Sequence, residues 1–226
     1  MTAVVAERLP EILSVLRTTA LEVGRDPATV QLIAVSKRQP AAAISAASAL
    51  GQIAFGENYL QEALAKQSAL AGRALEWHFI GRLQSNKTAE VAANFDWVHT
   101  VDRARTAERL NDQRPVTRGP LNVLVQVNVS GEASKGGVEP AALEELVEKI
   151  AMLPRLRLRG LMALPAPSAD FEQQRKPFSM LRALAEQCSV PLKHLSMGTS
   201  DDFRAAIHEG ATLVRLGTAV FGPRIA

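Results

Sequence analysis

The sequence predicts a closed (β/α)8 barrel, the TIM-barrel fold, preceded by one additional helix. Short apolar segments alternate with amphipathic or alanine-rich segments along most of the chain, and this alternation is typical of a parallel sheet. Eight such units within residues 32–226 fit a closed barrel better than an open doubly wound sheet, which is the alternative. No Gly-x-Gly-x-x-Gly motif follows an expected strand, so nothing favours a dinucleotide site. We expect residues 1–226 to form one domain.

The elements follow from the apolar patterns. An amphipathic helix over Val4–Val23 ends at Gly24. The strands are expected at Leu32–Ser36, Ile53–Phe55, Glu76–Ile80, Asp96–His99, Asn122–Val129, Leu156–Met162, Leu192–Leu195 and Thr212–Leu216. The helices between them are expected at Pro40–Leu50, Tyr59–Ala71, Ser85–Ala93, Arg103–Arg114, Pro140–Met152, Phe171–Cys188 with an interruption near Pro177, and Ser200–Glu209. Asn122–Val129 is the clearest strand, because its valines alternate with other residues.

The overall composition argues against several classes of protein. Lysine and arginine exceed aspartate and glutamate by 26 to 23, but the charges are dispersed, which gives nucleic-acid binding little support. No apolar run approaches the roughly 18 residues of a membrane span, and Met1–Arg8 does not resemble a signal peptide. The single cysteine, Cys188, excludes an internal disulfide, and we expect it to be buried and inert. The histidines show no metal-ligand spacing, so we expect no metal site. Because neither a signal peptide nor a membrane span is indicated, we expect a cytoplasmic protein.

Lys37 is the first candidate functional residue. It follows the first strand, where alternation places Ile33, Val35 and Lys37 on one face. Catalytic and binding groups of barrels collect at the carboxyl ends of strands. An inward amine at this end can form an imine with a carbonyl compound, and the alternative is a lysine that turns out to solvent.

The ends of the last two strands predict a phosphate site. Barrels frequently bind phosphate there, through backbone N–H groups and a helix N-terminus. The stretch Ser196-Met197-Gly198-Thr199-Ser200 is small and rich in hydroxyl groups, and Gly217-Thr218 offers a close backbone approach and one hydroxyl. Thr199 with Asp202 also fits a capping box, which is a structural reading of the same loop. Asp201 and Asp202 would repel a phosphate unless they face away.

Arg215 completes the set of candidates. It alternates with Leu213 along the last strand, so both should point into the barrel, where a buried arginine needs an acceptor. An aromatic ring nitrogen is a suitable one, and the fixed positive charge would keep that nitrogen unprotonated. A lysine imine, an arginine at a pyridine nitrogen and a phosphate site together describe pyridoxal 5′-phosphate (PLP).

Several motifs carry a resemblance to a known family. They are Ala34-Val-Ser-Lys37, Phe55-Gly-Glu-Asn58 with Gln61-Glu62, Trp77-His-Phe-Ile-Gly81 with Leu83-Gln-Ser-Asn-Lys87, Val127-Asn-Val-Ser130 with Ser134-Lys-Gly-Gly137, Arg159-Gly-Leu-Met162, Leu195-Ser-Met-Gly198 with Ser200-x-Asp202, and Arg215-Leu-Gly-Thr218. In this order they resemble the pyridoxal phosphate homeostasis protein family, also called the proline synthetase co-transcribed family, whose barrel is similar to that of alanine racemase. The family commonly has methionine where Thr199 stands, and Arg82 occupies a variable position.

The resemblance implies a monomeric barrel that holds PLP as an imine on Lys37. It also implies that Asn58 lies by the cofactor and that Arg215 faces the pyridine nitrogen. The phosphate would be held by Ser200, Gly217 and Thr218, and we count Met197 and Gly198 of the same loop as cofactor-binding.

The choice between an enzyme and a carrier rests on what the chain lacks. Racemases that resemble this barrel use a second, β-rich domain and a partner's tyrosine, whereas this chain ends at Ala226 and has only Tyr59, expected to pack at a helix start. We therefore expect a homeostasis protein that passes PLP to apo PLP-dependent enzymes, with no catalytic residues. The alternatives are a PLP-dependent amino-acid racemase or decarboxylase, and a class I aldolase-like barrel without a cofactor.

Two further residues have open roles. Lys135 follows the fifth strand in a glycine-flanked loop, and it is either a second amine for PLP leaving Lys37 or a solvated loop lysine. His78 ends the third strand, and it either faces the site or is a core histidine bonded to backbone.

Overall fold

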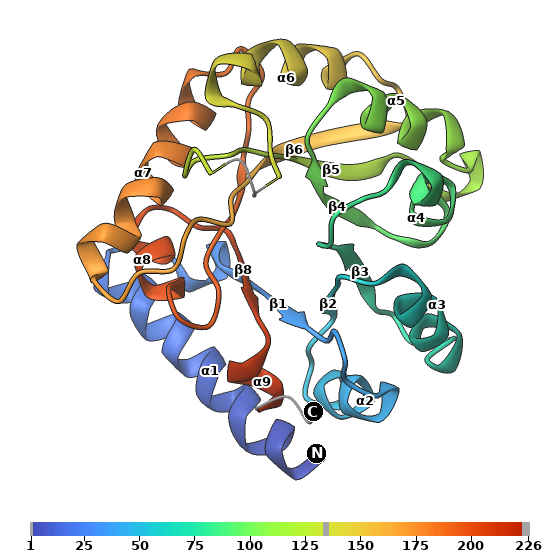
Figure 1. Ribbon diagram of the computed structural model, residues 1–226. Coiled ribbons are helices and arrows are strands. Elements are labelled where there is room, and N and C mark those ends of the chain that lie inside the picture. Colours follow the sequence, from blue (N-terminus) through green and yellow to red (C-terminus); the bar gives the residue numbers. More distant parts are fainter. Residues whose placement is uncertain (1, 133–135, 223–226) are drawn as a thin grey trace.

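A computed structural model describes residues 2–132 and 136–222 of the chain. Its parallel strands are hydrogen-bonded in sequence order, and the last strand pairs with the first to close the barrel (Figure 1). The strands are β1 (Gln31–Val35), β2 (Ala54–Glu57), β3 (Glu76–Phe79), β4 (Trp97–Val101), β5 (Leu121–Gln126), β6 (Leu156–Met162), β7 (His194–Ser196) and β8 (Leu213–Leu216). The expected (β/α)8 barrel is confirmed, and the open sheet was the wrong alternative. Lys135 lies outside the described residues.

The helices form a ring around the barrel (Figure 1). They are α1 (Thr2–Glu22), α2 (Ala41–Ala49), α3 (Leu60–Ala69), α4 (Thr88–Asn94), α5 (Ala104–Gln113), α6 (Leu143–Ala151), α7 (Phe171–Gln187), α8 (Phe203–His208) and α9 (Thr218–Phe221). The additional N-terminal helix is confirmed as α1, which packs on the outside of the ring against α2, α8 and α9. Within the described part of the chain, no helix combines the length and apolarity needed to cross a bilayer.

The strands separate two environments because neighbouring side chains point to opposite faces. Residues such as Phe55, Val98 and Leu195 face the helices and join one large apolar core. A small apolar cluster fills part of the barrel interior: Ile33, Ala54, Trp97, Leu124, Met162 and Leu213. The rest of the interior is polar, since the fully buried His78, His99 and Ser196 also point inward.

Strand β5 is shorter than the expected Asn122–Val129. It ends at Gln126 because the chain beyond it pairs with its own returning loop. The Asn128 N–H donates to the Val138 carbonyl at 2.9 Å, and the Val138 N–H donates to the Gln126 carbonyl at 2.8 Å. The Val127 N–H still donates to the Met162 carbonyl of β6 at 2.9 Å, and beyond Val127 local pairing replaces the extension of the barrel strand.

Helix α7 runs without a break through Pro177, so the expected interruption is wrong. Proline removes one helical hydrogen bond and disfavours a helix interior. Here Phe178, Leu181 and Ala185 bury one face of the helix against the barrel, directly after the proline. Packing of that apolar face holds the part of the helix after the proline against the barrel.

Helix α8 begins at Phe203, later than the expected start at Ser200. Gly198 has a φ of +92°, a conformation that favours glycine, and a Cβ there would lie 2.7 Å from the Ala206 Cβ. The chain therefore turns sharply at Gly198 and reaches the helix only after a loop. Ser200 belongs to that loop and lies at the carboxyl end of the barrel.

Candidate functional site

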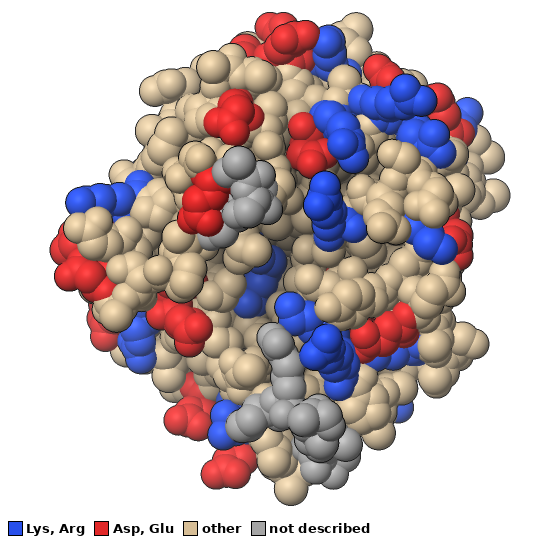
Figure 2. Space-filling view, in the orientation of Figure 1, with Lys and Arg blue, Asp and Glu red and all other residues tan. Residues whose placement is uncertain are grey.

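A pocket of about 280 Å³ opens at the carboxyl ends of the strands. Figure 2 shows a hollow near the middle of this face, with basic side chains inside it and along its rim. Its volume lies near the lower end of the range for small-molecule sites, roughly 300–1,000 Å³. The predicted site residues that line it are Lys37, Asn58, Ser200, Arg215, Gly217 and Thr218. Thr199, from the predicted phosphate-binding stretch, also lines it, together with residues that the sequence did not mark as binding: Val35, Gln39, Ile80, Met162, Leu164, Asp201 and Gly222.

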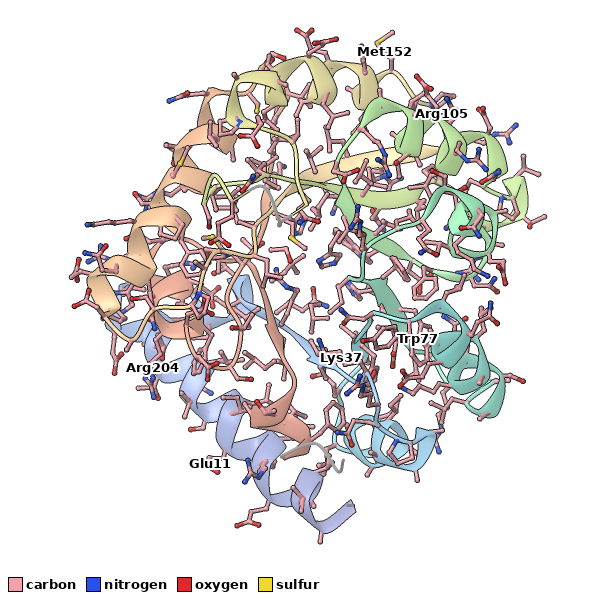
Figure 3. The ribbon with its side chains drawn as sticks, in the orientation of Figure 1. Glu11, Lys37, Trp77, Arg105, Met152 and Arg204 are labelled. Atoms are coloured by element: carbon pink, nitrogen blue, oxygen red, sulfur yellow. The ribbon has the colours of Figure 1, made fainter. Side chains whose placement is uncertain are left out.

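Lys37 lies just beyond β1 and lines the pocket. Figure 3 places it toward the middle of the ring of helices, whereas Glu11, Arg105 and Met152 lie on the outer side. The alternation that predicted an inward Lys37 is therefore consistent with its place here, because Ile33 belongs to the interior cluster and Val35 also lines the pocket.

A buried polar cluster, Glu57, Glu62 and Lys66, holds the residues on both sides of Lys37. The Ser36 hydroxyl donates to Glu57 Oε1 at 2.6 Å, and the Arg38 N–H donates to Glu62 Oε1. Arg38 has a φ of +60°, which is uncommon for a residue other than glycine. These bonds fix the backbone at the point where the Lys37 side chain leaves it.

Lys66 links the two glutamates of this cluster to the backbone of Ser36. Its ammonium group lies 2.6 Å from oxygens of Glu57, Glu62 and the Ser36 backbone. Glu57 is fully buried, and burial raises the pKa of its carboxyl group while the hydrogen bond from Lys66 opposes that rise. A buried charge of this kind is tolerated because it is paired.

Arg215 on β8 is buried and faces the pocket, as its alternation with Leu213 predicted. Its Nη1 donates to the Ser196 hydroxyl at 2.6 Å, and its Nη2 donates to the Ala163 carbonyl at 2.9 Å. Burial lowers the pKa of its guanidinium to about 10, so the group stays cationic at neutral pH. A guanidinium has five N–H donors, so these two bonds hold it in place without exhausting it.

The anion corner, which we define as Ser200, Gly217 and Thr218, lies where the loops after β7 and β8 meet. The short helix α9 begins at Thr218, and the first N–H groups of a helix have no partner within it. The sequence pattern did not predict this helix. Hydroxyl groups and unpaired N–H donors together suit the oxygens of a phosphate group.

The acidic residues of this loop divide between two places. The Thr199 hydroxyl donates to Asp202 Oδ1 at 2.9 Å, and the Thr199 N–H donates to the same oxygen, so Asp202 is engaged within its own loop. Asp201 is exposed and lines the pocket. Only one of the two bonds of a capping box is present, because the Thr199 hydroxyl donates to Asp202 and α8 begins later, at Phe203. One carboxylate, that of Asp201, remains near the anion corner.

Asn58 lines the pocket and carries an unsatisfied polar atom. Its Oδ1 is buried and has no hydrogen-bond partner among the described residues. A Cβ at Gly81 would lie 2.1 Å from the Asn58 carbonyl oxygen, so only glycine permits this approach of the two strand ends. Buried polar atoms without partners are rare, and one in a residue that lines a pocket is a candidate partner for a polar group of a ligand.

The remaining predicted residues lie elsewhere. Met197 is fully buried in the large apolar core, and Gly198 packs against α8, so the cofactor-binding role of both stays a prediction.

His78 is a buried core histidine whose partners are side chains rather than backbone. Cys188 is partly buried, and burial raises the pKa of its thiol to about 11, so little thiolate forms at neutral pH. Among the described residues no three histidine, cysteine or acidic side chains gather as a metal site.

Fold and site together define a class: a (β/α)8 barrel that presents one lysine, one arginine and an anion corner to a single small-molecule pocket. The family model described as alanine racemase, N-terminal domain, matches residues 18–224. A pyridoxal phosphate homeostasis protein of Pseudomonas aeruginosa is 56% identical over 220 residues, which cover 97% of this chain and 96% of that protein. The corresponding Escherichia coli K12 protein is 48% identical over 226 residues, 97% of each chain.

A solved structure agrees with these relatives. PipY of Synechococcus elongatus PCC7942, determined with PLP bound, is 38% identical and has a TM-score of 0.83, covering 96% of this chain and all of that one. The chain belongs to the pyridoxal phosphate homeostasis protein family, which confirms the resemblance drawn from its motifs.

Proposed function

We propose that this chain binds PLP in the pocket at the carboxyl ends of its strands and holds it as an imine on Lys37. The observation that carries this proposal is the convergence of Lys37, Arg215 and the anion corner on one pocket of small-molecule size. The presence of PLP in the related PipY structure supports it.

Each residue has a separate role in holding the cofactor. When bound, PLP supplies an aldehyde that reacts reversibly with a primary amine. Lys37 provides that amine, and the Glu57, Glu62 and Lys66 cluster fixes the backbone from which it extends. The Arg215 guanidinium donates to the ring nitrogen and keeps it unprotonated. Ser200, Gly217 and Thr218 hold the phosphate.

Three further residues complete the proposed site. Asn58 lines the pocket, and its Oδ1, which has no partner among the described residues, accepts from a polar group of the cofactor. Met197 and Gly198 belong to the loop that carries Ser200, and we assign them to the cofactor site through the backbone of this loop.

The function that we propose for this site is storage and transfer of PLP rather than catalysis. Among the described residues that line the pocket, the ionisable ones are Lys37, Asp201 and Arg215. A racemase needs acid–base groups on both faces of its substrate, and an unprotonated ring nitrogen is a poor electron sink. We propose a cytoplasmic, monomeric, single-domain protein that releases PLP to apo PLP-dependent enzymes.

Absorbance and turnover test this proposal. The purified protein should be yellow, because an imine of PLP absorbs visible light, whereas a resting class I aldolase is colourless. Incubation with L-alanine should give no D-isomer and no amine, while an added apo enzyme should gain activity as the yellow colour declines. Sustained turnover of an amino acid at about 1–10³ per second would contradict storage and favour the racemase or decarboxylase.

A further inference from the structure

A chain of hydrogen bonds crosses the interior of the barrel from its amino end to the pocket. Glu76 Oε1 lies 2.7 Å from His78 Nε2, and His78 Nδ1 lies 2.9 Å from His99 Nε2. His99 Nδ1 lies 2.8 Å from the Ser196 hydroxyl, which in turn lies 2.6 Å from Arg215 Nη1. We call these five residues the interior relay.

Donor and acceptor roles in the interior relay follow from its two ends. Arginine has no acceptor, so the Ser196 hydroxyl accepts from Arg215. An ionised carboxylate has no donor, so Glu76 accepts from the Nε2–H of His78. If both imidazoles are neutral, the carboxylate end sets the arrangement: each histidine carries its proton on Nε2, and the Ser196 hydroxyl donates to His99 Nδ1.

The surroundings favour a neutral His99. His78, His99 and Ser196 are fully buried. Burial lowers the pKa of His99 well below its usual value. The hydrogen bond from His78 lowers the pKa of Glu76, so Glu76 is an anion at neutral pH. The relay therefore connects a fixed anion at one end to a fixed cation at the other.

The two ends of the relay differ in exposure. Glu76 is the first residue of β3, and its side chain is 34% exposed, so it reaches solvent at the amino end of the barrel. Arg215 is 5% exposed and lines the pocket at the opposite end. At the amino end the relay is flanked by His194, whose Nε2 lies 3.3 Å from Arg159 Nη2, and by Gln31, which donates to Glu76.

We propose that Glu76, His78, His99 and Ser196 are positioning residues, which orient the Arg215 guanidinium toward the ring nitrogen of the bound cofactor. The inference rests on the proposed binding of PLP. Because His99 accepts the hydrogen of the Ser196 hydroxyl, the lone pairs of that oxygen are directed away from His99 and toward Arg215, and the tautomer of His99 is fixed in turn by His78 and Glu76. The solvent-facing carboxylate thus acts on the pocket through three buried groups.

Nitrogen NMR of the protein without cofactor tests the relay independently of PLP. In long-range proton–nitrogen spectra at pH 7, His78 and His99 should both be neutral Nε2–H tautomers. Glu76→Gln keeps an acceptor oxygen and should preserve both tautomers, whereas Glu76→Ala should leave His78 in a mixture of tautomers. A neutral Nδ1–H tautomer, or an imidazolium, at either histidine in the unsubstituted protein would overturn the proposal.

PLP dissociation tests the consequence. Ser196→Ala removes one of the two acceptors of Arg215 and should weaken PLP binding about tenfold, the effect of one lost hydrogen bond to a charged group. Glu76→Ala should also weaken PLP binding, by a smaller factor. Glu76→Gln should bind PLP as tightly as the unsubstituted protein. Val98→Ala is the matched control, because Val98 is buried next to His99 on β4 but faces the helices.

The outcomes separate the two proposals. Equal PLP affinity in Ser196→Ala, Val98→Ala and the unsubstituted protein would overturn the positioning role. If borohydride reduction leaves no pyridoxyl group on the unsubstituted protein, the proposed function fails, while the histidine tautomers still decide whether the relay exists.

Discussion

The ammonium group of Lys66 donates a 2.6 Å hydrogen bond to the carbonyl oxygen of Ser36, the residue directly before Lys37. The same ammonium group pairs with the fully buried Glu57. A residue on α3 therefore fixes the exit of β1, and the amine at the pocket depends on a buried ion pair behind it.

The first prediction concerns this ion pair. Lys66→Met leaves the Glu57 carboxylate buried without its partner, so we expect the free energy of unfolding to fall by about 3–5 kcal/mol in urea titrations. Lys149→Met is the control, because Lys149 pairs with Glu145 at 2.6 Å on the surface, where solvent screens such pairs and they contribute little to stability. Equal losses in the two variants would show that the buried cluster does not anchor the β1 exit.

The second prediction concerns Arg215. Arg215→Lys cannot bond both Ser196 and the Ala163 carbonyl while facing the ring nitrogen, since a lysine presents one point charge. We expect PLP binding to weaken about tenfold or more, measured by equilibrium dialysis or by fluorescence. Arg105→Lys on the exposed surface should leave it unchanged. Unchanged binding in Arg215→Lys would remove Arg215 from the cofactor site.

The third prediction separates the phosphate from the ring. Thr218→Val removes one hydroxyl of the anion corner and should weaken binding of PLP roughly fivefold to tenfold, about 1 kcal/mol. Pyridoxal, which has no phosphate group, should bind the variant and the unsubstituted protein equally well. If the substitution weakens both ligands by the same factor, Thr218 acts on the shape of the pocket and not on the phosphate.

The fourth prediction concerns pH. The pKa of His99 is lowered well below its usual value in the folded protein, chiefly by burial, whereas in the unfolded chain it is about 6.5. Below pH 6.5 the unfolded chain binds a proton at His99 that the folded protein does not, so this residue lowers stability as the pH falls. The contribution approaches about 1.4 kcal/mol per pH unit.

His99→Gln isolates that contribution, because other groups titrate in both proteins. Between pH 6.5 and 5, the free energy of unfolding should fall less steeply in the variant than in the unsubstituted protein. Parallel curves would mean that His99 binds its proton equally well in the folded and unfolded states.

The architecture could be predicted from the sequence because alternation of short apolar strands with helices is a local signal. The inward positions of Ile33 and Leu213 followed from a period of two, and both lie in the interior cluster. The end of β5 and the continuity of α7 at Pro177 could not be predicted. Both depend on contacts between distant segments, namely the returning loop and the buried face of Phe178.

The pocket residues were predictable where strand ends and motifs marked them, as with Lys37 and Arg215. The buried residues that hold the backbone beside Lys37 were not predictable, because Lys66 and Ser36 are far apart in sequence and meet only in the folded barrel. The same limit applies to the interior relay. His78 and His99 show no metal-ligand spacing along the chain, yet the neighbouring strands β3 and β4 place His78 Nδ1 2.9 Å from His99 Nε2 in the barrel.

The central claim is that Lys37 carries the cofactor, and borohydride reduction followed by peptide mass mapping tests it most directly. Reduction converts an imine into a stable secondary amine, so PLP-loaded protein should yield a pyridoxyl group on the peptide that contains Lys37. Lys37→Ala should lose that adduct while keeping the fold. A pyridoxyl group on another lysine of the unsubstituted protein, or an adduct of equal yield in Lys37→Ala, would contradict the account.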